Sequence, residues 1–341
     1  MRIHILFSFK DSPSGGGNQF LKAMRDSLRN FGVYEERAEN ADVILFNSHH
    51  ELKKVFWLKK KFPEKVFVHR LDGPIQLYRG KDKSIDNLIF KINKLLADGV
   101  IFQSNWSREQ NRKIHQNFPK YQTVIYNAPD LSIFNKIAKK EFSAFRKIKL
   151  VAVSWSNNLK KGFDVYKYLD EHLDFKKYEM VFIGNSPVDF KNIKTIKPVG
   201  SKELAVILKQ NDIYITSSQK DPCSNALIEA LSCGLPAVGL NDGGHPELIK
   251  KGGELFWGTG DIISKIEKVA NNYLYYQNKL SEFSLKKASE QYFYFCLKIF
   301  EDAKNGYYFP RQVGVVSKIS FYFSVIGNLL DRASKRFFKK V

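Results

Sequence analysis

Two carboxylic acids, Asp221 and Glu229, stand eight positions apart in the segment DPCSNALIEALSCGLP. Asp221 lies beside a proline in a turn-like sequence, and Glu229 lies in an apolar run that predicts a helix. Carboxylates accept hydrogen bonds from hydroxyl groups, so acids ahead of a helix and inside it can hold two parts of one hydroxyl-rich ligand. We expect Glu229 to bind ribose hydroxyls and Asp221 to bind the hydroxyls of a sugar, which together would grip a nucleotide sugar.

The helix that carries Glu229 has a predicted start suited to a phosphate. Ser224 is a typical N-cap residue, and the N–H groups that follow an N-cap have no partner within the helix. These free donors, with the positive end of the helix dipole behind them, favour a diphosphate. They belong to Asn225, Ala226 and Leu227.

Both acids also have an ordinary structural interpretation. Asp221 before Pro222 is a common turn pair. A glutamate in an amphipathic helix is usually exposed, but almost all the neighbours of Glu229 are apolar. This pattern indicates a partly buried acid, which needs a partner.

The elements that position these residues are short apolar runs that alternate with helical patterns. Such alternation predicts parallel βαβ units in layered sheets, an α/β fold. A lysine-rich polar stretch at 135–149 interrupts the rhythm, so we expect two doubly wound, Rossmann-like halves with ligand outside the carboxyl ends of the strands. The expected domains are 1–145, 146–305 and a basic amphipathic segment, 306–341.

The composition indicates a folded chain that meets a negatively charged partner. The 341 residues are 43% hydrophobic, enough for two cores, and carry a net charge of +20. The N-terminal run has no cleavage site, and no run reaches the roughly 20 apolar residues of a spanning helix, so we expect neither secretion nor membrane insertion. Three cysteines without CxxC spacing indicate a reducing cytoplasm and no disulfide.

Several well-known reactive motifs are absent from the sequence. It contains no GxxxxGK[ST] loop, and its one GxG apart from the GGG run, in WGTGDII, lacks the third glycine of a dinucleotide site. It has no DxD or HExxH pattern, no set of histidines at metal-ligand spacing and no GxSxG elbow. We therefore expect no obligatory metal and no cofactor apart from the nucleotide-sugar substrate.

The spacing of the two acids resembles the acid-x7-acid signature of glycosyltransferase family 4, whose members are retaining nucleotide-sugar enzymes with the GT-B fold. The family usually has Glu where this chain has Asp221. The resemblance implies two Rossmann-like domains that face a cleft and a C-terminal helix that crosses back to the N-terminal domain. Similar segments follow in order over roughly residues 1–250, among them SGGGNQFLKAM, VFVHRLDGP, VIYNAPDLSIF, LKKGFDVYKYL, VFIGNSP and NDGGHPELI.

The resemblance also implies roles for individual residues. Lys161 is expected to act with Asp221 in catalysis by holding the donor diphosphate, and Lys160 is expected to be a second cation, since the Arg that the family commonly has about six residues upstream is absent. His69 is expected near the reacting sugar, although a histidine at a strand end is as often a structural hydrogen-bonding residue. The remaining implied donor-binding residues are the glycines Gly16, Gly17, Gly184, Gly243 and Gly244.

The resemblance implies a metal-independent glycosyltransferase that moves a sugar from a UDP- or GDP-linked donor to a hydroxyl acceptor. Two basic, aromatic-rich stretches, 52–62 and 311–341, indicate an anionic membrane surface. We therefore expect a glycan or lipid-linked acceptor of cell-surface polysaccharide synthesis (lipopolysaccharide, capsule or exopolysaccharide), at the inner face of the cytoplasmic membrane.

Three alternatives stay open. One is a non-catalytic subunit that binds sugar nucleotides or glycans, and another is a GT-B nucleotide-sugar epimerase. The third is a nucleic-acid binder, which is the weaker interpretation of the charge because no recognised binding module accompanies it. The C-terminal stretch could also simply pack back on the first domain.

Overall fold

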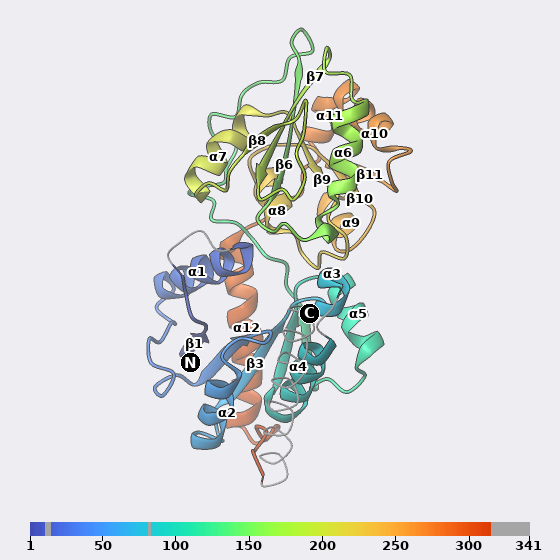
Figure 1. The fold of residues 1–341 in the computed structure, drawn as a ribbon. Coiled ribbons are helices and arrows are strands. Elements are labelled where there is room, and N and C mark those ends of the chain that lie inside the picture. The colour runs from blue at the N-terminus through green and yellow to red at the C-terminus, as the bar shows by residue number, and fades with distance from the viewer. Residues whose placement is uncertain (11–14, 81–82, 315–341) are drawn as a thin grey trace. The chain divides into compact units, whose positions relative to one another are not determined.

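The computed structural model describes residues 1–10, 15–80 and 83–314, and the chain divides into two compact units. The first unit is Met1–Phe9, Met24–Tyr126 and the chain from Lys287 onward; the second is Lys10–Ala23 and Asn127–Lys286. Each unit is a parallel sheet with helices packed against it (Figure 1). The longer segment of the second unit begins at Asn127, whereas the boundary expected from the sequence is at 145. Most of the expected segment 306–341 lies outside the described residues.

Sheet 1, in the first unit, has the strand order β1-β2-β3-β4-β5, and all neighbouring strands are parallel. Its strands are almost continuously apolar, as is typical of parallel strands that are covered on both faces. In chain order the elements are β1 (Ile3–Leu6), α1 (Gly15–Asn30), β2 (Val43–Asn47), α2 (Leu52–Lys61), β3 (Val66–Leu71), α3 (Ile75–Arg79), α4 (Lys83–Leu96), β4 (Gly99–Phe102), α5 (Asn105–Ile114) and β5 (Tyr121–Val124).

Sheet 2, in the second unit, has the order β11-β10-β9-β6-β7-β8, also parallel. The order reverses between β6 and β9, because β7 and β8 extend from one side of β6 and the later strands from the other. The elements are β6 (Ile148–Ser154), a 3₁₀ turn η1 (Leu159–Lys161), α6 (Phe163–His172), β7 (Tyr178–Gly184), β8 (Lys194–Ile196), α7 (Ser201–Gln210), β9 (Ile213–Thr216), α8 (Asn225–Ser232), β10 (Ala237–Leu240), α9 (His245–Ile249), β11 (Gly253–Phe256), α10 (Ile262–Asn271) and α11 (Tyr273–Gln277).

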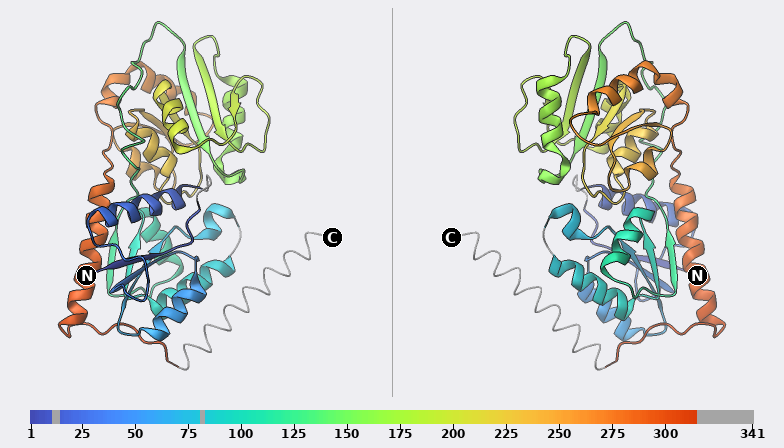
Figure 2. Two further views of the ribbon diagram at one scale, coloured as in Figure 1. Left: turned by 90° about the vertical axis from the view of Figure 1, so that its left-hand side faces the viewer. Right: turned by 90° about the vertical axis from the view of Figure 1, so that its right-hand side faces the viewer.

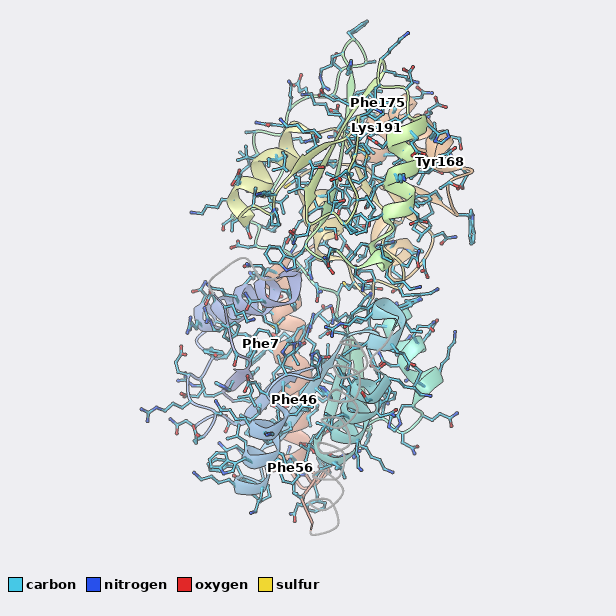
Figure 3. The ribbon with its side chains drawn as sticks, viewed as in Figure 1. Phe7, Phe46, Phe56, Tyr168, Phe175 and Lys191 are labelled. Atoms are coloured by element: carbon cyan, nitrogen blue, oxygen red, sulfur yellow. The ribbon has the colours of Figure 1, made fainter. Side chains whose placement is uncertain are left out.

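Aromatic side chains fill both cores. Phe46 and Phe56 lie in the core of the first unit (Figure 3). In the second unit Phe163, Tyr166 and Phe182 pack against one another with ring centroids 5.3–6.1 Å apart. Close packing of this kind resists deformation, so the loops at the strand ends start from rigid supports.

The last helix of the described residues, α12 (Leu285–Lys304), lies along sheet 1 (Figures 1 and 2). Arg70 of β3 donates a hydrogen bond to the Tyr292 hydroxyl at 3.1 Å. A side chain at Gly99 of β4 would collide with Ile299, so the helix packs directly on the strand. The predicted return of a C-terminal helix to the first domain is confirmed. Among the described residues, no helix has the length and hydropathy that a membrane span requires.

A buried carboxylate holds the chain that follows α12. Asp98 accepts hydrogen bonds from Lys59 Nζ at 3.0 Å and from the Phe67 amide at 2.8 Å. It also accepts from the Tyr308 hydroxyl at 2.9 Å and the Arg311 amide at 2.7 Å. The side chains of Lys59 and Asp98 are fully buried, and the extra donors compensate for the loss of water around that pair.

Candidate functional site

A cavity of about 530 Å³ lies at the carboxyl edge of sheet 2. Loops that leave β6 and β9 turn in opposite directions because the strand order reverses between these strands, and such a reversal opens a crevice where ligands bind. The cavity is formed by residues of the second unit, which are Gly16, Gln19, Val153, Ser154, Trp155, Ser156, Lys161, Val199, Gly200, Ser201, Leu204, Ser218, Asp221, Cys223, Ser224, Asn225, Ala226 and Glu229.

Lys161 is held at the cavity by the turn that follows η1. The hydroxyl of Ser217, at the end of β9, donates to the carbonyls of Lys161 at 3.1 Å and of Gly162 at 2.9 Å. Gly162 has φ of 74°, and a β-carbon there would collide with Ser217. Only glycine allows this close approach, which fixes the backbone of Lys161 beside the strand end.

Asp221 and Lys161 both line the cavity and form an ion pair with each other. Lys161 Nζ lies 3.0 Å from Asp221 Oδ2, and the amide of Cys223 donates to the other carboxylate oxygen at 3.3 Å. Burial alone would raise the pKa of Asp221, but the Lys161 ammonium and these hydrogen bonds hold that pKa below its ordinary value. Asp221 is therefore a carboxylate at neutral pH.

Gly243 and Gly244 support Asp221 from behind. The amide of Gly244 donates to the Asp221 carbonyl at 2.8 Å. Gly243 has φ of 64°, and a β-carbon on it would collide with the Asp221 backbone. Neither glycine is among the residues that line this cavity, so their contact with the donor stays a prediction.

Glu229 lines the same cavity and lacks a counter-charge. Burial raises its pKa to about 8, and its carboxyl group makes no hydrogen bond or ion pair with another described residue. A partly buried carboxyl group without partners is costly, so Glu229 is a strong candidate for contact with a ligand.

The start of α8 completes the charged end of the cavity. Ser224 is the N-cap residue, as predicted, and its hydroxyl accepts from the Leu227 amide at 3.4 Å. Ser224, Asn225 and Ala226 line the cavity, whereas the Leu227 side chain is buried in the core and its amide is occupied by Ser224. Gly16 lies so close to Asn225 that a side chain would not fit between them.

Three other predicted donor-binding residues do not line the cavity. Lys160 Nζ donates to Gln219 Oε1 at 3.2 Å, and Lys160 is not among the residues that line the cavity. Gly184 has a φ of 132°, and a β-carbon there would collide with the Ser154 carbonyl. Gly184 lines a neighbouring polar cavity instead. Gly17 lies within α1 in open space.

His69 lies inside the first unit, with none of its surface exposed. Its Nε2 donates to the Ser48 carbonyl at 2.9 Å, and its Nδ1 accepts from Asn93 at 3.1 Å. The ring stacks on Phe46 at a centroid distance of 4.1 Å. Burial lowers the pKa of His69 to about 4, so it is neutral. This geometry favours the structural interpretation of His69 over contact with a sugar.

An apolar wall of the cavity was missed in the sequence. Trp155 directly follows β6 and is 45% exposed, and Val153, Val199 and Leu204 also line the cavity. A tryptophan at the end of a predicted strand was the available signal in the sequence.

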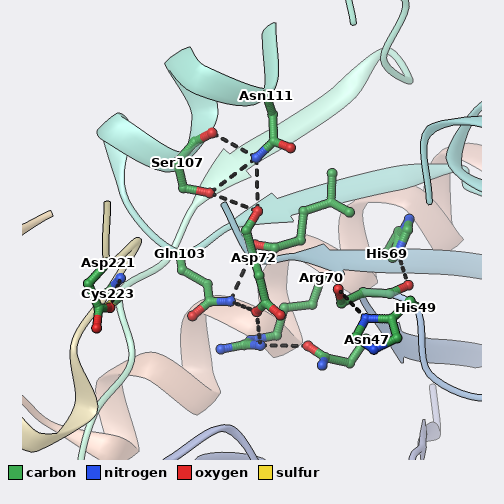
Figure 4. Close-up of polar contacts among 12 residues, drawn as sticks. Asn47, His49, His69, Arg70, Asp72, Gln103, Ser107, Asn111, Asp221 and Cys223 are labelled. Carbon is green, nitrogen blue, oxygen red and sulfur yellow. Dashed lines mark hydrogen bonds and ion pairs between the residues drawn. The ribbon is translucent and has the colours of Figure 1, made fainter. Parts of the chain in front are cut away.

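A polar cluster at the carboxyl ends of β2, β3 and β4 was also missed (Figure 4). Buried Arg70 donates to Asn47 Oδ1 at 2.5 Å and lies 3.4 Å from Asp72 Oδ1. Gln103 also donates to Asp72, whose side chain is 25% exposed. The edge of a parallel sheet is a usual place for ligands, and Asp72 offers a fixed acceptor there.

Comparison with known proteins agrees with this geometry. Residues 156–286 match the family described as "Glycosyl transferases group 1". N-acetyl-alpha-D-glucosaminyl L-malate synthase of Bacillus anthracis is 25% identical over 211 residues, which are 57% of this chain and 55% of that protein. A probable sucrose-phosphate synthase of Thermosipho melanesiensis is 29% identical over 154 residues, 43% of this chain and 35% of that protein. The chain thus spans about half or less of these curated relatives.

Solved structures share the fold at low identity. Anabaena HepE in complex with UDP and glucose aligns with a TM-score of 0.66 at 14% identity, covering 87% of this chain and all of HepE. Sucrose-phosphate synthase from Thermosynechococcus elongatus aligns with a TM-score of 0.64 at 12% identity over the whole of both chains. The fold is therefore GT-B, and residues 156–286 are similar to the glycosyl transferases group 1 family.

Proposed function

We propose that this chain is a retaining glycosyltransferase that moves a sugar from a nucleotide-diphosphate sugar to a hydroxyl acceptor. One observation carries the proposal: Lys161, Asp221, Glu229 and the start of α8 all line one cavity at the strand reversal. These groups match, in chemistry, the successive parts of a nucleotide sugar.

The cavity has a charged side and an apolar side. Lys161 and the amides at the start of α8 suit the diphosphate, because both direct positive charge at it. Glu229 suits the ribose hydroxyls and Asp221 the hydroxyls of the sugar. Trp155, Val199 and Leu204 then suit the nucleobase. HepE in complex with UDP and glucose supports a UDP-linked donor.

The reaction follows from this placement. When the bond between the sugar and the diphosphate breaks, negative charge develops on the leaving phosphate oxygen. Lys161 and the start of α8 stabilise that charge, which lowers the barrier. The acceptor hydroxyl forms the new bond on the same face of the sugar and gives its proton to the departing phosphate oxygen. Asp221 orients the sugar, and His69 needs no part in these steps.

The acceptor would bind to the first unit. Asp72 offers a carboxylate held by Arg70 and Gln103, which suits a hydroxyl group of a glycan or lipid-linked sugar. We expect the acceptor to be an intermediate of cell-surface polysaccharide synthesis. In support, Staphylococcus aureus TarM, which shares the fold with a TM-score of 0.59 at 16% identity, was solved with alpha-GlcNAc-glycerol and UDP.

The test is release of UDP or GDP from a panel of nucleotide sugars, with the wild type, Lys161→Ala, Asp221→Asn and Glu229→Gln. Glu203→Gln, which changes an exposed acid on α7, is the matched control. We expect one donor to turn over, the three cavity variants to lose at least tenfold, and the control to match the wild type. No turnover of any donor by the wild type would contradict the proposal.

The same experiment separates the alternatives. A non-catalytic subunit would bind a nucleotide sugar without turnover, even with acceptors present. An epimerase would convert one nucleotide sugar into another and would not release the nucleotide when an acceptor is added. Both outcomes are distinguished by analysing the nucleotide sugar that remains after incubation.

A further inference from the structure

One face of α2 is basic and carries an exposed tryptophan. Trp57 is 48% exposed, and the lysines around it on the helix surface are exposed as well. At 100° per residue these side chains share one side of the helix. The α2 basic face consists of Lys53, Lys54, Trp57, Lys60 and Lys61.

The opposite side of α2 is firmly anchored. Leu52, Val55, Phe56 and Leu58 are buried in the core of the first unit. Lys59 is buried too, bound to Asp98 and to the Lys65 carbonyl at 2.7 Å. Phe56 is therefore not available at the surface, and the exposed side of the helix is held by a rigid core.

The lysines of the α2 basic face are not neutralised within the protein. None of the four forms an ion pair with a described residue. Lys61 lies over the Trp57 ring, with Nζ 4.8 Å from its centroid. The nearest acids along the chain are at the two ends of the helix: Glu51, which accepts from Ser8, and Glu64.

We propose that the α2 basic face docks the protein on an anionic lipid surface. A tryptophan among lysines is suited to the boundary between headgroups and acyl chains, because the indole inserts while the ammonium groups meet lipid phosphates. A nucleic acid would also attract the lysines, but the central exposed indole favours lipid. The docking is independent of sugar transfer and can be tested without it.

The experiment is sedimentation of the full chain with vesicles of phosphatidylglycerol and phosphatidylcholine, and with phosphatidylcholine alone. Binding is expected only to the anionic vesicles and should weaken with salt. The double variant Lys53→Glu/Lys60→Glu should weaken vesicle binding by on the order of 100-fold or more, because each basic charge near the surface contributes about 1 kcal/mol and each substitution reverses one. Trp57→Ala should weaken it by about tenfold.

The control is Lys194→Glu/Lys197→Glu, which changes the same charge at exposed positions in and beside β8. It should bind vesicles nearly as well as the wild type, and all variants should keep their thermal stability and nucleotide binding. The proposal is overturned if the wild type ignores anionic vesicles, or if the α2 variants bind them as the wild type does. Preference for RNA over vesicles would overturn it too.

Discussion

The ammonium of Lys161 lies 3.0 Å from the Asp221 carboxylate, so the cation best placed for a diphosphate is already paired with the acid best placed for a sugar. A ligand that brings both a phosphate and hydroxyls can engage the two partners together. A ligand with phosphate alone has to draw Lys161 away from Asp221.

Asp221→Asn should therefore separate binding from turnover. The variant keeps the shape of the side chain but releases Lys161 from its counter-charge, so the affinity for UDP alone should stay the same or rise. Sugar release should fall by at least tenfold, because the sugar loses its orienting carboxylate. Calorimetry with UDP and a nucleotide-release assay measure the two effects; equal losses in both would contradict this role.

Glu229 should make donor binding depend on pH. Its pKa of about 8 means that the carboxylate, which accepts from ribose hydroxyls, is scarce at pH 6 and dominant at pH 9. If only the carboxylate binds, affinity for the nucleotide should rise by up to about 100-fold between these values. Glu229→Gln should bind the nucleotide weakly, with an affinity that does not change with pH. A wild-type affinity that does not change with pH would contradict this role of Glu229.

Glu229→Gln should also change stability with a definite sign. Because burial raises the pKa of Glu229 above its unfolded value, the native state holds a proton that the unfolded state has lost between about pH 4.5 and 8. Wild-type stability therefore falls over that range relative to the variant. Thermal unfolding should show a higher Tm for Glu229→Gln at pH 9 and a smaller difference at pH 5.

Gly162→Ala should displace Lys161 as well as destabilise the second unit. A β-carbon would collide with Ser217, and φ of 74° strains any other residue. The expected loss is about 1–3 kcal/mol of unfolding free energy, with weaker nucleotide binding by the folded protein. Gly258→Ala, where the added carbon meets open space, is the control and should be near neutral.

Trp155→Ala should weaken nucleotide binding by about 1–3 kcal/mol, the usual range for loss of stacking on a base, whereas Trp155→Phe should retain most of the affinity. Binding of pyrophosphate should be unaffected by either change. Comparing UDP and pyrophosphate in competition experiments measures this; equal weakening of both would show that Trp155 does not contact the base.

Asp98→Asn should destabilise the first unit by about 3–5 kcal/mol, because Lys59 would keep a buried charge without its counter-ion. Adding Lys59→Met to this variant should recover part of the loss. Glu301→Gln, an exposed change on α12, is the control. Denaturant unfolding measures all three, and a neutral Asp98→Asn would contradict the account of this buried pair.

The features that could be predicted from sequence are those set by local pattern. Neighbouring residues predict that Ser224 is an N-cap and that α8 begins there, with Asp221 in the preceding turn and Glu229 within the helix. The βαβ alternation predicts both sheets. Two features depend on tertiary packing, which local pattern does not specify. The Leu227 amide donates to the Ser224 hydroxyl instead of staying free for a ligand, and His69 is buried because β3 lies inside sheet 1. Trp155 became part of the site through the strand reversal, which sequence patterns do not specify.

The most direct measurement is calorimetric titration of UDP, GDP and their sugars into the wild type and Lys161→Ala. The account predicts saturable binding of one nucleotide at one site, with affinity at least tenfold lower in the variant and restored by neither salt nor pH. No binding of any nucleotide, or equal affinity in the two proteins, would contradict the assignment of this cavity.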